Sequence, residues 1–200
     1  MFNLDEQLTS AVMRVLFNIE RLINPSFEEK EAFLKILHQR TLKKNELFLK
    51  EGAVCTSIAF IEKGCVRYYY EAEDKEVSKD FVFENGVIGS FASFFTQEPS
   101  LLNIIALEET TIIEMFYEDV MFLYDRYPAW QKLGRIIAQE QFVRAEKREA
   151  ALLKDAPDKR FLTLIEEHPK IFKKVPLQYI ASYLGITRET LSRYRSKMKV

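Results

Sequence analysis

The sequence predicts an α+β fold: an antiparallel β-roll or jelly-roll barrel flanked by helices, one long helix, and a small C-terminal domain of short helices. Short β-branched and aromatic segments separated by Gly, Asn and acidic turns fill the middle of the chain. A helical pattern unbroken by proline follows, and two short helical segments joined at a glycine close the sequence. The predicted boundaries are 1–128 for the β-roll, 129–155 for the long helix and 156–200 for the C-terminal domain.

The first elements are two helices within residues 4–38. They are separated at "NPSFEE", where Asn24-Pro25 ends one helix, and Ser26 with Glu29 forms a capping-box start for the next. From Thr41 the pattern changes to strands that end near Phe116. Their segments read "ELFLKEG", "SIAFIEKG", "CVRYYYE", "SKDFVFENG", "LNIIALEE" and "TTIIEMF".

Few residues of this sequence could carry catalysis or bind a metal. Cys55 and Cys65 could form a disulfide or half of a metal site, but two buried apolar residues are the favoured interpretation. His38 and His168 have no partner at metal-ligand spacing, and no glycine-rich phosphate-binding loop occurs. We therefore expect no catalytic residue, no metal and no cofactor, and do not expect an enzyme.

A short helix over 118–127 ends at Pro128, and a helix of about 26 residues, near 40 Å long, follows from Ala129. Its apolar residues lie on more than one face, which favours a dimer interface over burial against the barrel alone. The predicted interface residues are Trp130, Leu133, Ile137 and Val143.

Charge is distributed unevenly along the chain. From Pro157 to Val200 there are ten basic and four acidic residues, a net charge of +6, so the other residues carry −7 of the total of −1. A basic end on an acidic body is typical of a module that binds a polyanion, and a solvated basic helix is the alternative.

The helix "DKRFLTLIEEHP" opens the C-terminal domain, and the segment "VPLQYIASYLGITRETLSRYRSK" follows it. Pro176 begins a helix there that Gly185 ends, because glycine tolerates the left-handed backbone of a helix terminus. Thr187 is a suitable N-cap for the second helix. At about 100° per residue, Thr190, Leu191, Tyr194 and Met198 share one face of that helix and the polar residues share the other.

Such a partition is typical of a helix-turn-helix, whose second helix reads base edges in the major groove. Arginine can fork onto guanine, and glutamate can accept from cytosine. Glu189 among arginines suggests sequence readout, although it could also complement the helix dipole. The predicted DNA-binding residues are Thr187, Arg188, Glu189, Ser192, Arg193, Arg195, Lys197 and Lys199.

With these features, the sequence resembles the Crp/Fnr-type transcription regulators, most strongly at "LKDAPDKRFLTLIEEHPKIFKKVPLQYIASYLGITRETLSR". The resemblance implies a β-roll of the cyclic-nucleotide-binding type, a dimer helix and a DNA-binding domain. It also implies base contacts from Arg188, Glu189 and Arg193 to a two-fold symmetric site with half-sites about 34 Å apart.

The sequence departs from the nucleotide-binding pattern of this family at "IGSFASFFTQEPSLLNII". Ser90 replaces a glutamate and Leu101 or Leu102 replaces the arginine that would hold a phosphate, so we expect no tight cyclic-nucleotide binding. The residues of this segment either form ordinary core or line a pocket for an unknown apolar or uncharged effector. Its predicted pocket comprises Gly89, Ser90, Phe91, Leu101 and Leu102.

The second departure is a wing that is missing or reduced after the second helix, which predicts a shallow salt dependence of DNA binding. Without a membrane-spanning run or a signal segment, we expect a cytoplasmic protein. The expected partners are double-stranded DNA and a second copy of the chain, with RNA polymerase and a small-molecule effector as further candidates. The competing function is a ligand-sensing or protein-interaction β-roll that reads no specific DNA.

Overall fold

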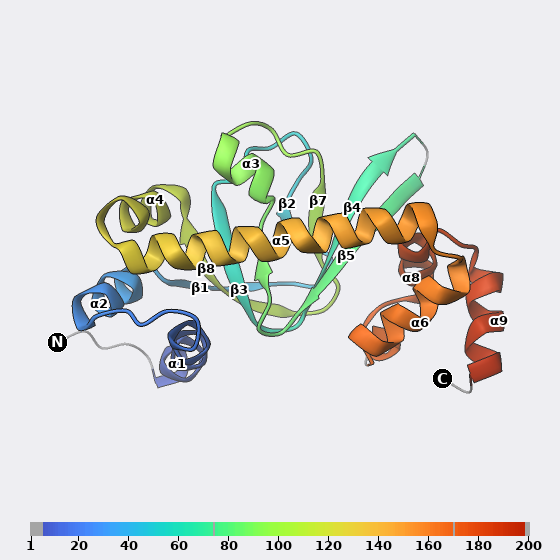
Figure 1. The fold of residues 1–200 in the computed structure, drawn as a ribbon, viewed down its shortest axis with the longest axis horizontal. Helices are drawn as coiled ribbons and strands as arrows, with labels where there is room; N and C mark the ends of the chain where they lie inside the picture. The colour runs from blue at the N-terminus through green and yellow to red at the C-terminus, as the bar shows by residue number, and fades with distance from the viewer. Residues whose placement is uncertain (1–5, 74, 170, 199–200) are drawn as a thin grey trace.

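The computed structural model describes residues 6–73, 75–169 and 171–198. Helix α5 (Pro128–Lys154) runs along the length of the molecule. The helices α1 (Glu6–Glu20), α2 (Phe27–Lys35) and α4 (Tyr117–Arg126) lie at one end of it, as Figure 1 shows, and the C-terminal helices lie at the other. The predicted α+β class, with an antiparallel β-roll and a long helix, is confirmed.

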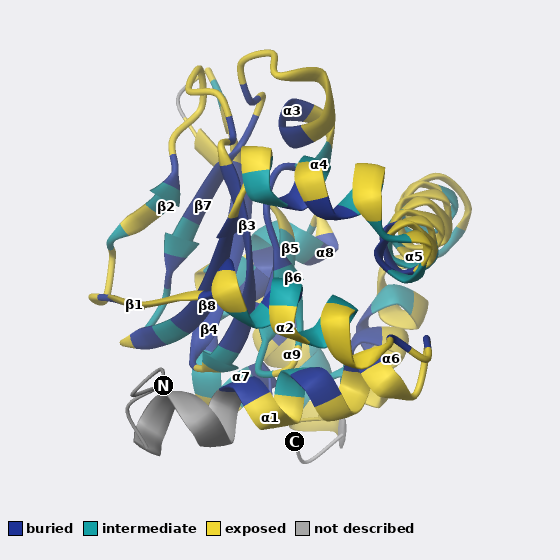
Figure 2. Ribbon diagram, turned by 90° about the vertical axis from the view of Figure 1, so that its left-hand side faces the viewer, coloured by how far each residue is buried: buried dark blue, intermediate teal, exposed yellow. Residues whose placement is uncertain are grey.

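Two four-stranded antiparallel sheets form the roll, in the orders β1-β8-β3-β6 and β2-β7-β4-β5. Apolar side chains from both sheets meet between them, and these residues form the buried interior seen in Figure 2. The strands are β1 (His38–Leu42), β2 (Leu47–Leu49), β3 (Ser57–Lys63), β4 (Cys65–Ala72), β5 (Lys75–Phe83), β6 (Val87–Ile88), β7 (Asn103–Ala106) and β8 (Thr110–Phe116).

The predicted helix break and capping box are present at the start of α2. Ser26 N donates to the Glu29 carboxylate at 2.7 Å, and Glu29 N donates to Ser26 Oγ at 3.2 Å. This reciprocal pair satisfies two amides that the helix terminus would otherwise leave without partners.

Four elements were not predicted from the sequence: β1, β6 and the short helices α3 (Phe91–Thr96) and α7 (Ile171–Lys174). Strand β1 lies at the edge of its sheet, and four of its five residues are exposed. It therefore lacks the apolar alternation that reveals a half-buried strand.

Both cysteines are buried and free, as the favoured interpretation of the sequence has it. Cys65 lies on β4, a strand whose two faces are both covered. Burial raises the pKa of the Cys65 thiol to about 12, so the thiol stays protonated at neutral pH.

The C-terminal domain comprises α6 (Pro157–Glu167), α7 (Ile171–Lys174), α8 (Leu177–Leu184) and α9 (Arg188–Met198). Its core, which includes Phe161, Ile180 and Leu191, is continuous with Cys65 and Phe81 on the outer face of the roll. Helix α9 ends at Met198, and Lys199 and Val200 lie outside the described residues, so the missing or reduced wing stays a prediction. Among the described helices, none combines the length and apolar character needed to cross a bilayer.

Candidate nucleic-acid interface

The turn between α8 and α9 has the predicted geometry. Gly185 adopts a left-handed backbone with φ of 66°. Its amide donates to the Ser182 carbonyl at 3.1 Å, and Ile186 N donates to the Ala181 carbonyl at 3.0 Å. These bonds satisfy carbonyls at the end of α8 and let the chain reverse within a few residues.

One face of helix α9 packs against the core of the C-terminal domain. Thr187 Oγ1 accepts from Thr190 N at 3.2 Å, as expected of an N-cap. Leu191 is fully buried, and the Tyr194 ring lies 5.5 Å from the Phe161 ring between centroids. The orientation of α9 is therefore fixed by its apolar side.

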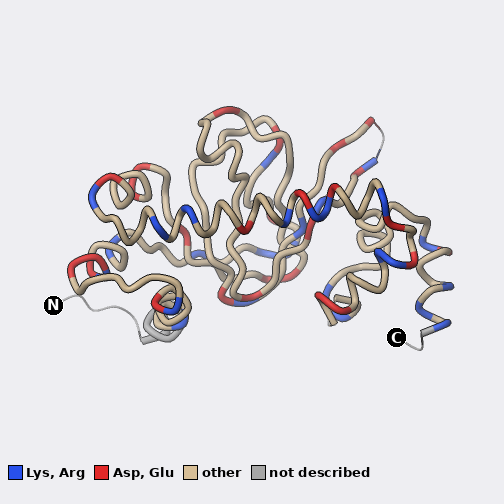
Figure 3. The backbone as a smooth tube through the Cα atoms, viewed as in Figure 1, with Lys and Arg blue, Asp and Glu red and all other residues tan. Residues whose placement is uncertain are grey.

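The opposite face of α9 is exposed to solvent. Among the described residues, no carboxylate forms an ion pair with Arg188 or Arg193. Figure 3 shows basic residues recurring along this helix at the end of the molecule. The face borders a hollow of about 560 Å³ lined by Leu177, Arg188, Glu189, Ser192, Arg193 and Ser196.

Arg195 is placed differently from the other predicted DNA-binding residues that the structure describes. Arg195 is half-buried at the edge of the face, with its guanidinium 4.9 Å from the centroid of the Phe172 ring. Its buried Nε has no hydrogen-bond partner among the described residues. Lys199 lies outside the described residues, whereas Thr187, Ser192 and Lys197 are exposed.

Glu189 is fully exposed in the first turn of α9. The pKa of its carboxyl is lowered, first by a hydrogen bond from its own backbone amide and then by the Thr187 hydroxyl. The carboxylate thus stays ionised at neutral pH and interacts with the helix terminus in the unbound chain.

The residues of the predicted effector pocket do not share one environment. Gly89 and Ser90 are buried, Leu102 is buried, Phe91 is half-buried, and Leu101 is 77% exposed. Tyr68 Oη accepts from Gly89 N at 2.9 Å, so this backbone amide is already occupied within the roll.

The same segment does not fit an anionic nucleotide. Glu98 is the single charged residue between Gly86 and Leu107 in the sequence, and it carries the wrong sign for a phosphate. Ser93 Oγ, a possible neutral donor, instead bonds to the Glu98 carbonyl and accepts from Cys55 N at 2.9 Å. The segment supplies no cation here, where a phosphate needs charge-assisted partners.

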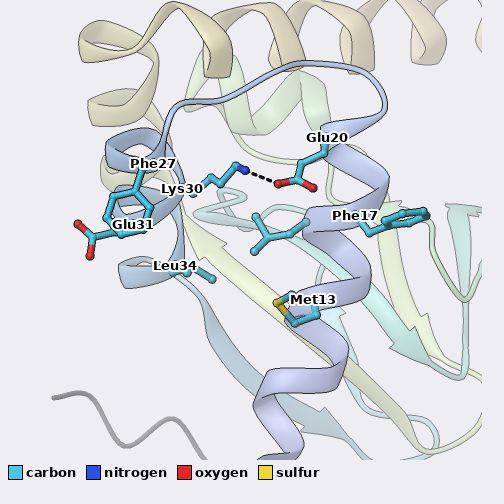
Figure 4. A pocket seen from close by; sticks show the side chains of 8 residues that line it. Met13, Phe17, Glu20, Phe27, Lys30, Glu31 and Leu34 are labelled. Atoms are coloured by element: carbon cyan, nitrogen blue, oxygen red, sulfur yellow. Dashed lines mark ion pairs between the residues drawn. The ribbon is translucent and has the colours of Figure 1, made fainter.

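A second hollow, of about 320 Å³, lies between α1 and α2 (Figure 4). It is largely apolar, with the side chains of Met13, Phe17 and Phe27 exposed. Lys30 and Glu20 form an ion pair across it at 2.5 Å. It lies at the opposite end of the molecule from α9 and includes none of the predicted effector-pocket residues.

The four predicted dimer residues are divided between two faces of α5. Trp130 and Leu133 are buried in the core of their own chain, where the Trp130 ring stacks on Phe33 at 4.5 Å between centroids. Ile137 packs against the same core. The predicted interface stays a prediction: within one chain, Val143 is exposed, at 47%, whereas Trp130 and Leu133 are buried.

Sequence reasoning missed a set of residues that join the C-terminal domain to the roll. Arg67 of β4 is 2% exposed, and its guanidinium lies 3.8 Å from the centroid of Tyr179 on α8. Lys174 of α7 contacts Glu84 and Glu108 of the roll. An arginine within the apolar run "CVRYYYE" was the available signal, since charged residues are rarely buried unless they are paired.

Comparison with known proteins places this geometry among characterised folds. Residues 39–127 match the cyclic nucleotide-binding domain family. No curated protein matches the sequence as a relative.

Three solved structures illustrate the similarity of fold. FixK2 from Bradyrhizobium japonicum is 17% identical with a TM-score of 0.73, and the match covers 82% of this chain and 85% of that one. A mutant of CooA from Carboxydothermus hydrogenoformans is 17% identical with a TM-score of 0.67, over 91% and 83%. The c-di-GMP-responsive regulator CLP from Xanthomonas campestris is 16% identical with a TM-score of 0.65, over 87% and 92%. These Crp/Fnr-family neighbours confirm the fold that the sequence resemblance implies.

Proposed function

We propose that this chain, with the fold of the Crp/Fnr regulators, is a sequence-specific DNA-binding transcription regulator that acts in the cytoplasm. Two copies would place their α9 helices in successive major grooves of a palindromic site. One observation carries the proposal: Arg188 and Arg193 project, without ion-pair partners among the described residues, from a helix whose other face is anchored by Leu191 and Tyr194.

The exposed face offers the chemistry that base readout needs. Each of the two arginines can donate a bidentate pair to guanine O6 and N7, and the Glu189 carboxylate can accept from cytosine N4. Thr187, Ser192, Lys197 and Lys199 are assigned to phosphates or to base edges at the margins of the contact. Arg195, packed on Phe172, is assigned to a phosphate beside the groove.

We assign the outward stripe of α5, the side opposite Trp130, to contact with a second copy of the chain. On a helical wheel, Ile136, Val143 and Ala150 recur every seven residues, and Gln139, Glu146 and Leu153 follow each of them by three. Val143 and Leu153 are exposed by 47% and 76%. Val143 and Leu153, exposed on the side of α5 opposite Trp130, support a helix pair with the α5 of a second copy.

The roll is assigned a sensory or structural role that does not depend on tight binding of a cyclic nucleotide. The segment from Gly86 to Leu107 contributes no cation, and an anion without a charge-assisted partner is held weakly. RNA polymerase remains a candidate partner on the strength of the fold alone.

Selection from a random duplex pool tests the proposal. The full chain is incubated with the pool at moderate salt, with and without cell extract, and bound duplexes are sequenced. Enrichment of one palindrome by the chain, and not by an Arg188→Ala/Arg193→Ala variant, is expected. Binding without enrichment of any motif would favour the competing protein-interaction function, and a motif enriched only with extract would identify an effector requirement.

A further inference from the structure

Strand β4 contacts two domains at once because its side chains alternate between two cores. Val66 and Tyr68 point into the core of the roll, whereas Cys65 belongs to the core shared with the C-terminal domain. Arg67 shares the outer face with Cys65 and is 2% exposed. A guanidinium therefore lies buried at the boundary between the two domains.

Two nitrogens of this guanidinium have polar partners, and two aromatic rings lie close to it. Arg67 Nε donates to Ser78 Oγ at 2.8 Å, and Nη1 pairs with the Glu76 carboxylate. Its Cζ atom lies over two rings, 4.5 Å from the centroid of Tyr69 and 3.8 Å from that of Tyr179. Tyr69 comes from the roll and Tyr179 from α8, so the charge is sandwiched between the two domains.

Helix α8 also contacts the edge of a sheet through Ser182. Strand β5 is the last strand of its sheet, and its outer backbone groups have no strand partner there. Ser78 N donates to Ser182 Oγ at 2.9 Å, and Ser182 Oγ donates to the Glu76 carbonyl at 3.2 Å. The side chain of Ser182 thus takes the place of a neighbouring strand.

This arrangement leaves uncovered the exposed face of α9, which carries Arg188 and Arg193. The residues that meet the roll lie on α7, on α8 and at the end of α6, whereas the exposed arginines lie on α9. Figure 1 shows α9 on the far side of α8 from the sheet. Docking therefore holds the recognition helix without covering it.

We propose that Arg67, with Tyr179 and Ser182, forms a docking contact that positions the DNA-binding domain, and that Arg67 is a positioning residue for DNA recognition. The contact fixes α9 relative to α5 and so sets the separation of the two recognition helices in a dimer. Each base pair inserted between two half-sites changes both their separation and their relative rotation about the DNA axis. A fixed separation of the two α9 helices therefore selects one operator spacing. This inference rests on the proposed function.

Two variants weaken the contact with little risk to folding: Tyr179→Leu keeps an apolar side chain but removes the ring, and Ser182→Ala removes two hydrogen bonds. The double variant combines them. Tyr70→Leu is the matched control, because it removes the same kind of ring from β4, the strand that carries Arg67. Tyr70 is partly exposed and has no part in the docking contact. Arg67→Lys tests whether the planar guanidinium is required, since an ammonium cannot stack between two rings.

The first measurement needs no DNA. Hydrogen exchange of the segment 75–83 is followed by mass spectrometry, because the Ser78 amide is protected by Ser182. We expect exchange there to be about tenfold faster in the double variant, with β3 and β8 unchanged. Exchange at the wild-type rate in the double variant and in Arg67→Lys would overturn the docking contact, whatever the outcome with DNA.

The second measurement uses duplexes in which the selected half-sites are moved apart or together by one base pair. The wild-type chain and Tyr70→Leu should lose roughly tenfold in affinity per base pair, and the double variant less than about threefold. Base preferences within each half-site should not change. An unchanged spacing preference in the double variant would overturn the positioning role. If the wild-type chain selects no operator, the proposed function fails, and the exchange measurement still decides the docking contact.

Discussion

Arg160 of α6 donates from Nε and Nη2 to the carbonyl oxygen of Leu184, at 3.1 and 2.7 Å. Leu184 is the last residue of α8, so a guanidinium neutralises the negative end of the helix immediately before the turn. Arg160 Nη1 also donates to the Asp155 carbonyl at 2.6 Å, next to the end of α5. One side chain thus links the long helix to the turn that orients α9.

Replacing Gly185 by alanine tests how far this turn depends on its backbone. A built Cβ would meet only Arg160 Nη2, at 3.7 Å, which is an ordinary contact, but φ of 66° strains any L residue. We expect Gly185→Ala to lower the free energy of unfolding by roughly 1–2 kcal/mol, and Gly185→Asn by less. Urea denaturation gives both values. An alanine variant with the wild-type midpoint would show that the turn does not need a left-handed residue.

Removing the exposed arginines of α9 should change which sequences are bound. Arg188→Ala and Arg193→Ala should each cost about 1–3 kcal/mol on the selected operator and relax specificity at one position per half-site. Lys197→Ala should weaken binding to all sequences alike, as expected of a phosphate contact. Competition binding against random duplex at fixed salt measures the difference. Equal losses on specific and random DNA for all three variants would refute base readout.

Local signals in the sequence predicted several features of the structure correctly. Ser26 with Glu29, Gly185 and Thr187 each act on amides or carbonyls within a few residues, so their geometry follows from spacing alone. The exposed face of α9 followed from helical periodicity for the same reason.

The features that the sequence did not predict depend on contacts distant along the chain. Helix α5 is apolar on two faces, and its sequence does not say that Phe33 stacks on Trp130 or that Val143 stays exposed. Arg67 is buried because α8, more than 100 residues later, covers it. Strand β1 has little apolar pattern of its own and is held by its pairing with β8.

A charge on the outward stripe of α5 should separate the proposed dimer. Val143→Glu puts a carboxylate where two copies would pack, whereas Ala145→Glu puts one on an exposed flank of the same helix and serves as the matched control. We expect sedimentation velocity to show monomer for Val143→Glu and dimer for the control. Affinity for the palindrome should fall at least about tenfold in Val143→Glu, because two linked half-sites are then bound separately. A dimer that survives Val143→Glu would place the interface elsewhere.

Protonation of His168 at acid pH should weaken the packing of the C-terminal domain against the roll. This residue ends α6, and its ring lies 5.3 Å from the Phe83 ring of β5 between centroids. Burial lowers the pKa of His168 from its usual 6.5, and Arg144 lowers it further, whereas Asp80 and Glu167 act in the opposite direction. Because the unfolded chain then takes up the proton at a higher pH than the folded chain, stability present above pH 6.5 is lost as the pH falls through the lowered pKa.

The thermal midpoint should therefore fall between neutral pH and about pH 5, and the fall should be smaller in His168→Phe, which keeps an aromatic ring against Phe83 but cannot be protonated. His38→Gln, at an exposed position on β1, serves as the control and should retain the wild-type slope. Differential scanning calorimetry across this pH range measures all three chains. If His168→Phe loses as much stability on acidification as the wild-type chain, another group is responsible, and the Asp80–Arg144 pair, 2.8 Å apart, would be the next to replace.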